Sequence, residues 1–332
     1  MSDTPQATTP AERQTTPRHF DLRRALTMLG PAIGLVAVCI FFSVLRPRTF
    51  PTWANAQNII LHSVVVGIAA IGTTSVIISA GIDISIGATI AVVTVSVALF
   101  VNADLSPLLA ALGGIGVGAA CGLFNGTCIT WLRLNPFIVT LGTFLAFRGV
   151  ADELSHQQAV AANSTWLNNL MAPGEAPLFP WGVWILIILM ILTALMLRYT
   201  RFGRHIFAIG SNEQTARLCG IAVNRTKLAI YVLAGAFSGV AGVLMFSNLT
   251  EGDPTTSANT PLTAIAAAVI GGASLTGGQG SIIGTVIGSV LIMTLRSGCT
   301  QLNFSQGGQE MLTGIIIILA VLLDRLRNPP EA

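Results

Sequence analysis

The sequence predicts an all-α protein that crosses a membrane about ten times. Hydrophobic residues make up 52% of the 332 residues and charged residues only 9%, whereas a soluble chain carries about 25% charged residues. A membrane-spanning helix needs about 20 mostly apolar residues. The chain therefore has room for these spans and short connections, and its polar segments are too short to form a separate soluble domain.

The chain divides into three regions. Residues 1–25 are rich in Thr, Pro and Gln and predict a disordered tail, residues 26–324 hold the apolar segments, and residues 325–332 form a second short tail. The predicted spans are 26–45, 59–80, a third that follows the sequence GIDISIG and ends near 101, then 107–132, 136–150, 181–197, 228–249, 261–274, 281–296 and 309–323. An eight-span map, with merged or re-entrant segments around 81–101 and 261–296, stays open.

Basic residues are distributed unequally between the two sides of the ten-span map. Thirteen of the 17 Lys and Arg fall on the side of the N-terminus. The other side holds Arg46, Arg48, Arg148 and Arg296. Because cytoplasmic loops are enriched in Lys and Arg, we expect both termini to lie in the cytoplasm.

A basic segment, residues 198–227, separates the sixth and seventh predicted spans. It carries six of the Lys and Arg, including the only lysine, Lys227. Ser211 and Gln214 have the spacing of a capping box, and Gly220 suits the left-handed end of a short helix. A second helix is expected to begin near Asn224. The residues alone leave two interpretations open, a solvated basic loop or a helix that docks on another protein.

If the short helix docks in a groove, its small apolar face is expected to make the contact. That face includes Ala216 and Cys219.

Several motifs of enzymes are missing from the sequence. There is no GxxxxGK[ST] phosphate loop, no HExxH and no GxSxG, so we expect neither ATP hydrolysis by this chain nor a membrane hydrolase. No metal site is expected. The net charge of +3 follows the membrane topology, and we expect a lipid bilayer rather than a nucleic acid as the surrounding partner.

Four polar residues within apolar segments are candidates for a translocation pathway. Asp83 lies well inside an apolar region and can be a substrate or gate residue, although we favour a capping role in which Asp83 or Ser85 accepts amide hydrogens. Asn125, Thr140 and Thr143 can line a wet path or bond to backbone carbonyls. Asn125 is the most costly of these to leave unpaired, which makes it the best pathway candidate.

A stand-alone secondary transporter is a further alternative, from a different class. Ion-coupled carriers usually place ionisable residues within their spans. This chain offers only Asp83 for that purpose, which disfavours the alternative.

Glycines recur at every fourth position of the fourth span. Gly114, Gly118, Gly122 and Gly126 lie on one face of a helix, where another backbone can approach closely.

A series of motifs resembles the permease subunits of ribose-type ABC importers for monosaccharides. In order they are SAGIDISIGA, GLFNG, NPFIVTLGTFLAFRG, TRFGRHIFAIGSNEQTARLCGI, AAAVIGGASLTGGQGSIIGTVIG and QEMLTGIIIILAVLLD. The resemblance covers roughly residues 60 to 324. It departs from the family pattern at Ala80 and in RSGCTQLNFSQGGQE, which leaves the cargo open.

This resemblance implies a type II ABC importer-like fold in a bacterial inner membrane. It further implies a second permease, either a copy or a paralogue, a periplasmic sugar-binding protein, and an ATPase subunit that binds ATP and Mg²⁺, with no cofactor on this chain. It makes residues 198–227 the loop that couples to the ATPase, with candidate residues Arg204, Gly210, Asn212, Ala216 and Gly220. A nucleoside or a branched-chain amino acid remains an alternative cargo.

Overall fold

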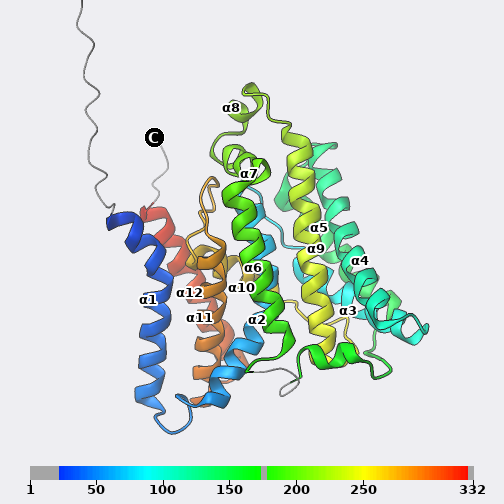
Figure 1. Cartoon of the computed structure of the whole chain (residues 1–332), viewed down its shortest axis with the longest axis vertical. Helices are drawn as coiled ribbons and strands as arrows, with labels where there is room; N and C mark the ends of the chain where they lie inside the picture. The colour runs from blue at the N-terminus through cyan, green and yellow to red at the C-terminus, as the bar shows by residue number, and fades with distance from the viewer. Residues whose placement is uncertain (1–21, 173–177, 328–332) are drawn as a thin grey trace, which may run out of the picture.

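The computed structural model describes residues 22–172 and 178–327, and α-helices dominate these residues. The helices in chain order are α1 (Leu22–Leu45), α2 (Trp53–Ile78), α3 (Ile86–Asn102), α4 (Pro107–Thr130), α5 (Pro136–Leu154), α6 (Trp181–Tyr199), α7 (Arg201–Ser211), α8 (Glu213–Leu218), α9 (Val223–Leu249), α10 (Thr260–Ile270), α11 (Ile282–Gln301) and α12 (Gln306–Arg327), shown in Figure 1. A 3₁₀-helix, η1 (Trp166–Leu170), and two short strands, β1 (Val160–Ala161) and β2 (Glu251–Gly252), lie in the connections.

Each of the ten predicted spans contains one helix, and α7 and α8 lie within the basic segment. Among the described residues, α2, α4, α6, α9 and α11 are long and apolar enough to cross a membrane. Shorter apolar helices occupy Gly30–Leu45, Ile86–Asn102 and Thr260–Ile270. The all-α architecture is thus confirmed, while the number of helices that cross the bilayer stays a prediction.

Some predicted boundaries differ from the helix ends. Helix α1 begins at Leu22 and α12 continues to Arg327, so parts of both predicted tails are helical. The remaining tail residues, 1–21 and 328–332, lie outside the described residues. Helix α5 continues to Leu154, four residues beyond the predicted span.

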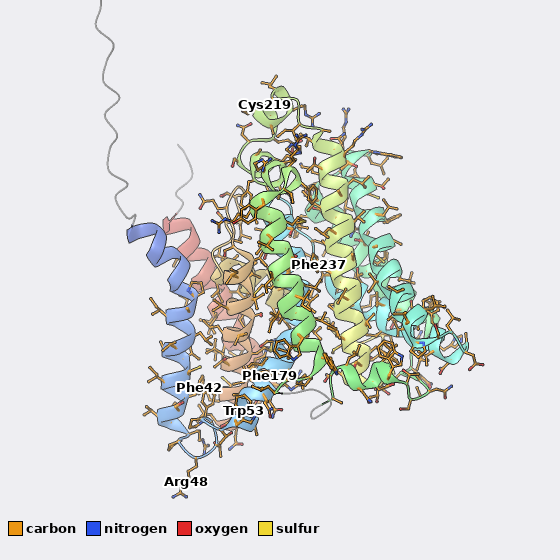
Figure 2. All side chains as sticks on the ribbon, in the orientation of Figure 1. Phe42, Arg48, Trp53, Phe179, Cys219 and Phe237 are labelled. Carbon is orange, nitrogen blue, oxygen red and sulfur yellow. The ribbon has the colours of Figure 1, made fainter. Side chains whose placement is uncertain are left out.

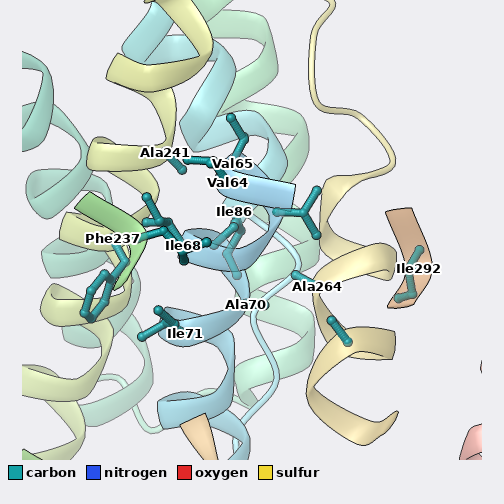
Figure 3. Close-up of a cluster of buried hydrophobic side chains, with 14 of the residues drawn as sticks. Val64, Val65, Ile68, Ala70, Ile71, Ile86, Phe237, Ala241, Ala264 and Ile292 are labelled. Atoms are coloured by element: carbon teal, nitrogen blue, oxygen red, sulfur yellow. The ribbon is translucent and has the colours of Figure 1, made fainter. Parts of the chain in front are cut away.

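Helix α2 forms the centre of the bundle. It packs against α9, α11, α10 and α6 and is the most completely buried of the five long apolar helices. A helix that is apolar on all sides is suited to such a position. Figure 3 shows part of the surrounding core, in which Ile68 and Ile71 of α2 lie near Phe237 of α9, and Ala264 and Ile292 come from α10 and α11.

The predicted glycine face of α4 contacts α9 backbone to backbone, which confirms that expectation. A Cβ atom on Gly118 would lie 2.5 Å from the carbonyl oxygen of Gly235 and 2.7 Å from the amide nitrogen of Gly239. Because neither helix presents a side chain here, their axes approach closely. Helices α4 and α9 therefore form one tightly packed unit.

The bundle has two ends, and different segments of the chain lie at each. The beginning of α1 and the end of α12 lie toward the end that carries α7 and α8 (Figure 1). Arg48, Trp53 and Phe179 lie at the opposite end from Cys219 (Figure 2). Segments predicted on one side of the membrane thus lie at one end of the molecule. We call the end with α7 and α8 the inner end and the other the outer end.

Candidate functional site

The turn between α2 and α3, residues 79–85, is held by a buried polar cluster. Oδ1 of Asp83 accepts hydrogen bonds from the amide nitrogen of Ser85 at 2.9 Å and from its Oγ at 2.7 Å. Nδ2 of Asn125, on α4, donates to the same Oγ at 2.8 Å. Oγ1 of Thr140, on α5, donates to the carbonyl oxygen of Ile82 at 3.3 Å. Three of the four pathway candidates therefore meet at this turn.

The hydrogen bonds of this cluster concern the two roles considered for these residues, which are a place in the translocation pathway and a structural role such as helix capping. Asp83 accepts the amide hydrogen of Ser85, the residue just before α3, but no hydrogen bond from an amide within α3, and Ser85 makes no side-chain cap. Thr143 lies one turn further along α5 and donates to the carbonyl oxygen of Thr140. Among the described residues, Oδ1 of Asn125 and Oη of Tyr231 are buried without a hydrogen-bond partner. None of the four candidates lines the large outer cavity described below.

The other side of this turn touches the basic segment. The amide nitrogen of Gly278, between α10 and α11, donates to the carbonyl oxygen of Ile78 at 2.8 Å. Gly210 of α7 lies against the same oxygen, so a Cβ atom there would collide with it. A Cβ atom on Gly277, whose φ is +89°, would lie 2.7 Å from the carbonyl oxygen of Gly210. Helix α7 thus contacts the end of α2 and the connection between α10 and α11 closely, through the backbone of Gly210.

The predicted capping box at Ser211 is wrong by one residue. Helix α7 continues through Ser211, whose Oγ donates to the carbonyl oxygen of Phe207 at 2.9 Å. Asn212 has extended backbone, and its Oδ1 accepts the amide hydrogen of Thr215 at 2.8 Å, so it caps α8 instead. Gly220 has φ +82°, which confirms the predicted left-handed end of the short helix.

Helix α8 presents a different face from the one expected. Ala216 is buried against Ile209 and Val223, so the chain itself covers the side chain predicted to contact a groove. Leu218 is 89% exposed and Cys219 is also exposed. The exposed apolar residues of this segment are therefore Leu218 and Cys219, so the expected exposed face is corrected for Ala216 but not for Cys219.

An ion-pair cluster fixes α8 to the start of α9. Oε2 of Glu213 lies 2.6 Å from Nζ of Lys227, and its Oε1 lies 3.0 Å from Nη2 of Arg217. The hydrogen bond from Lys227 is the largest of the influences that lower the pKa of Glu213. Arg204, another predicted coupling residue, is exposed and donates to the carbonyl oxygen of Tyr199 at 3.3 Å.

A cavity of about 760 Å³ opens at the outer end between α2, α9, α10 and α11. Carboxamides and hydroxyls dominate its polar lining: Asn55, Asn58, Asn248, Asn259, Gln301, Gln306, Thr255, Ser257, Thr260, Thr263, Ser297 and Thr300. Such groups both donate and accept hydrogen bonds, which suits a solute rich in hydroxyl groups. Sequence reasoning missed this site, because its residues lie at helix ends far apart in the chain.

The part of the sequence that departs from the family pattern contributes to this cavity. Five residues of that stretch, 296–310, line the cavity: Arg296, Ser297, Thr300, Gln301 and Gln306. The departing residues themselves, Ala80 and, within this stretch, Gly298 and Cys299, do not line the cavity.

Comparison with known proteins decides the family. A family model described as "Branched-chain amino acid transport system / permease component" matches residues 55–321. The chain belongs to this permease family. The permease is therefore a multi-pass membrane protein and a component of a transport system.

Curated relatives match over most of the permease. The ribose import permease protein RbsC of Bacillus subtilis (strain 168) is 37% identical over 311 residues, which cover 93% of this chain and 96% of that protein. The L-arabinose transport system permease protein AraH of Escherichia coli (strain K12) is 34% identical over 311 residues, 93% and 94% of the two chains. The fructose import permease protein FrcC of Rhizobium meliloti is 34% identical over 304 residues, 89% and 84%. No solved structure was found to match the chain.

Proposed function

We propose that this permease forms the path by which a monosaccharide enters a bacterial cell across its inner membrane. A periplasmic binding protein delivers the sugar at the outer end, and an ATPase that binds ATP and Mg²⁺ drives the transport from the inner end. Two permeases, identical or paralogous, work as a pair in a type II-like importer. All ten long segments cross the bilayer, with both termini in the cytoplasm.

The outer cavity is the observation that carries this proposal. Its carboxamides and hydroxyls match the hydrogen-bonding groups of a sugar. The side chains of Asn58, Asn248 and Gln306 make no hydrogen bond among the described residues and are exposed to the cavity. The names of the relatives add support, since the proteins of B. subtilis, E. coli and R. meliloti are permeases for ribose, L-arabinose and fructose.

The coupling role of residues 198–227 rests on the inner end. Helix α7 touches the end of α2 and the connection between α10 and α11 through glycine contacts, and α2, α10 and α11 all line the outer cavity. A movement of α7 and α8 is thus mechanically connected to the cavity walls. Gly210 lies at this contact, and α8 lies between Asn212 and Gly220. Leu218 is the exposed residue of α8 that would contact the ATPase.

Reconstitution in liposomes tests the proposal. The permease is combined with the ATPase and binding protein encoded beside it, and uptake of D-ribose, L-arabinose, D-fructose, uridine and L-leucine is measured. We expect ATP-dependent uptake of a monosaccharide and none without the ATPase. Uptake of uridine or L-leucine without uptake of any monosaccharide would show that the cargo is not a sugar. Uptake by the permease without its partners, driven by an ion gradient, would show that it is a secondary transporter.

A further inference from the structure

Arg296 is the one residue with a permanent charge among the described residues that line the outer cavity. The lining includes no Asp, Glu or Lys. The guanidinium group of Arg296 has a single hydrogen bond, from Nη2 to Oγ1 of Thr263 at 3.4 Å, and no ion pair within the described chain. Arg has five N–H donors, so most of them make no hydrogen bond within the described chain.

The acidic groups near the cavity accept hydrogen bonds from other residues and are not part of its lining. Oε1 of Glu310 accepts a hydrogen bond from Nδ2 of Asn259 at 3.1 Å, and the Glu310 side chain is exposed. Glu310 attracts Arg296 electrostatically without forming an ion pair with it. Oδ1 of Asp253 accepts hydrogen bonds from the amide and hydroxyl of Thr255. Neither carboxylate lines the cavity.

We infer that Arg296 sets the charge selectivity of the outer cavity, which admits neutral and anionic hydroxyl-rich solutes and rejects cationic ones. Guanidinium donors bind hydroxyl and carboxylate oxygens, with a preference for carboxylates because charge-assisted hydrogen bonds are stronger. A cationic amino sugar meets a like charge at this wall, and the carboxylate of Glu310, which partly offsets that charge, does not line the cavity. This inference deepens the proposed function, since it concerns the same cavity, and it names neutral sugars and sugar acids as the cargo class.

Small charged thiol reagents can measure this selectivity without ATPase, binding protein or sugar. Thr300 is exposed to the cavity and lies one helical turn from Arg296. A Thr300→Cys reporter is placed in a variant whose five native cysteines are replaced, and the full chain is held in lipid nanodiscs. The rates of modification by the anionic MTSES and the cationic MTSET are then compared as a ratio.

We expect Arg296→Gln to lower the MTSES/MTSET ratio about fourfold, because loss of one charge at roughly 8 Å slows the anion and speeds the cation by about twofold each. Arg296→Lys keeps the charge and should keep the ratio. Glu310→Gln removes an opposing charge and should raise it. Arg48→Gln, a matched change of an exposed arginine at the outer end that does not line the cavity, should leave it unchanged.

An unchanged ratio in Arg296→Gln, or an equal fall in Arg48→Gln, would overturn the inference. If Arg296→Gln fails to fold, Glu310→Gln decides, because removal of this opposing charge should raise the ratio, and a ratio that does not rise would overturn the inference. Failure of sugar uptake in the liposome experiment would refute the proposed function while leaving the measured ratio intact. The two ideas can therefore fail separately.

Discussion

Gly210 has no room for a side chain, because the carbonyl oxygen of Ile78 occupies the place of its Cβ atom. The same oxygen accepts the amide hydrogen of Gly278 at 2.8 Å. The end of α7 therefore rests directly on the end of α2 and on the connection between α10 and α11. This contact joins the proposed coupling element to helices that line the outer cavity.

Gly210→Ala is expected to impair coupling. Its methyl group must displace backbone, and overpacking of this kind typically costs about 1–3 kcal/mol. ATP-dependent uptake should fall sharply, while ATPase activity of the assembled complex becomes insensitive to the loaded binding protein. Gly142→Ala serves as the matched control, because nothing lies within 4 Å of a Cβ atom there. Equal uptake by the two variants would refute a coupling role for this contact.

Substitutions at Asp83 separate its hydrogen bonds from its charge. Asp83→Asn retains an oxygen that can accept from the amide and hydroxyl of Ser85. Asp83→Ala leaves those buried donors unpaired, which costs about 1–3 kcal/mol for each. Thermal unfolding of the purified permease should therefore shift down in Asp83→Ala and stay close to the parent value in Asp83→Asn. An equal loss in both variants would show that the negative charge itself is required.

The ion-pair cluster predicts a pH dependence of helix α8. The pKa of Glu213 is lowered in the folded chain, chiefly by the hydrogen bond from Lys227. Its contribution is thus present above the ordinary pKa of a glutamate and is lost as the pH falls through the lowered value. Exposed ion pairs contribute about 1 kcal/mol or less, so the effect is small and local.

Hydrogen exchange measures that effect. The protection factors of residues 213–220 should decrease as the pH is lowered through the acidic range. At every pH, Glu213→Gln should show the low protection that the parent shows only at acidic pH, with no pH dependence beyond that of intrinsic exchange. Parallel curves for the parent and Glu213→Gln would show that the ion pairs do not hold α8.

Local patterns in the sequence predicted much of the fold. Apolar segments located the ten helices other than α7 and α8, and glycines at every fourth position, such as Gly118, located the close contact of α4 with α9. Gly220 marked the end of the short helix, because few other residues adopt a positive φ without strain. These features depend on neighbours in the chain or on one helix face.

Features that depend on tertiary packing were not predictable in the same way. Asn212 caps α8 in place of Ser211, because α7 continues through Ser211. Ala216 is buried because α8 folds back on Ile209 and Val223, and the regular seven-residue spacing of these three residues is the one signal that could have indicated it. The outer cavity joins helix ends from distant parts of the chain, which no local pattern brings together.

The central claim is that an ATPase grips this permease at α8, and Leu218→Asp tests it most directly. Leu218 is 89% exposed, and surface substitutions usually change stability by about 0.5 kcal/mol or less, so the variant should insert and unfold like the parent. In a docked complex the new carboxylate would be buried without a partner, at a cost of several kcal/mol. Ala216→Asp is less informative, because that side chain is buried within the permease itself.

The measurement is co-purification of the ATPase with the permease, together with ATP-dependent uptake. Leu178→Asp is the control, since Leu178 is an exposed leucine next to Phe179 at the outer end. The account predicts that Leu218→Asp loses both the ATPase and uptake at normal abundance, while Leu178→Asp retains both. Co-purification of the ATPase with Leu218→Asp at the parent level, with normal uptake, would contradict it.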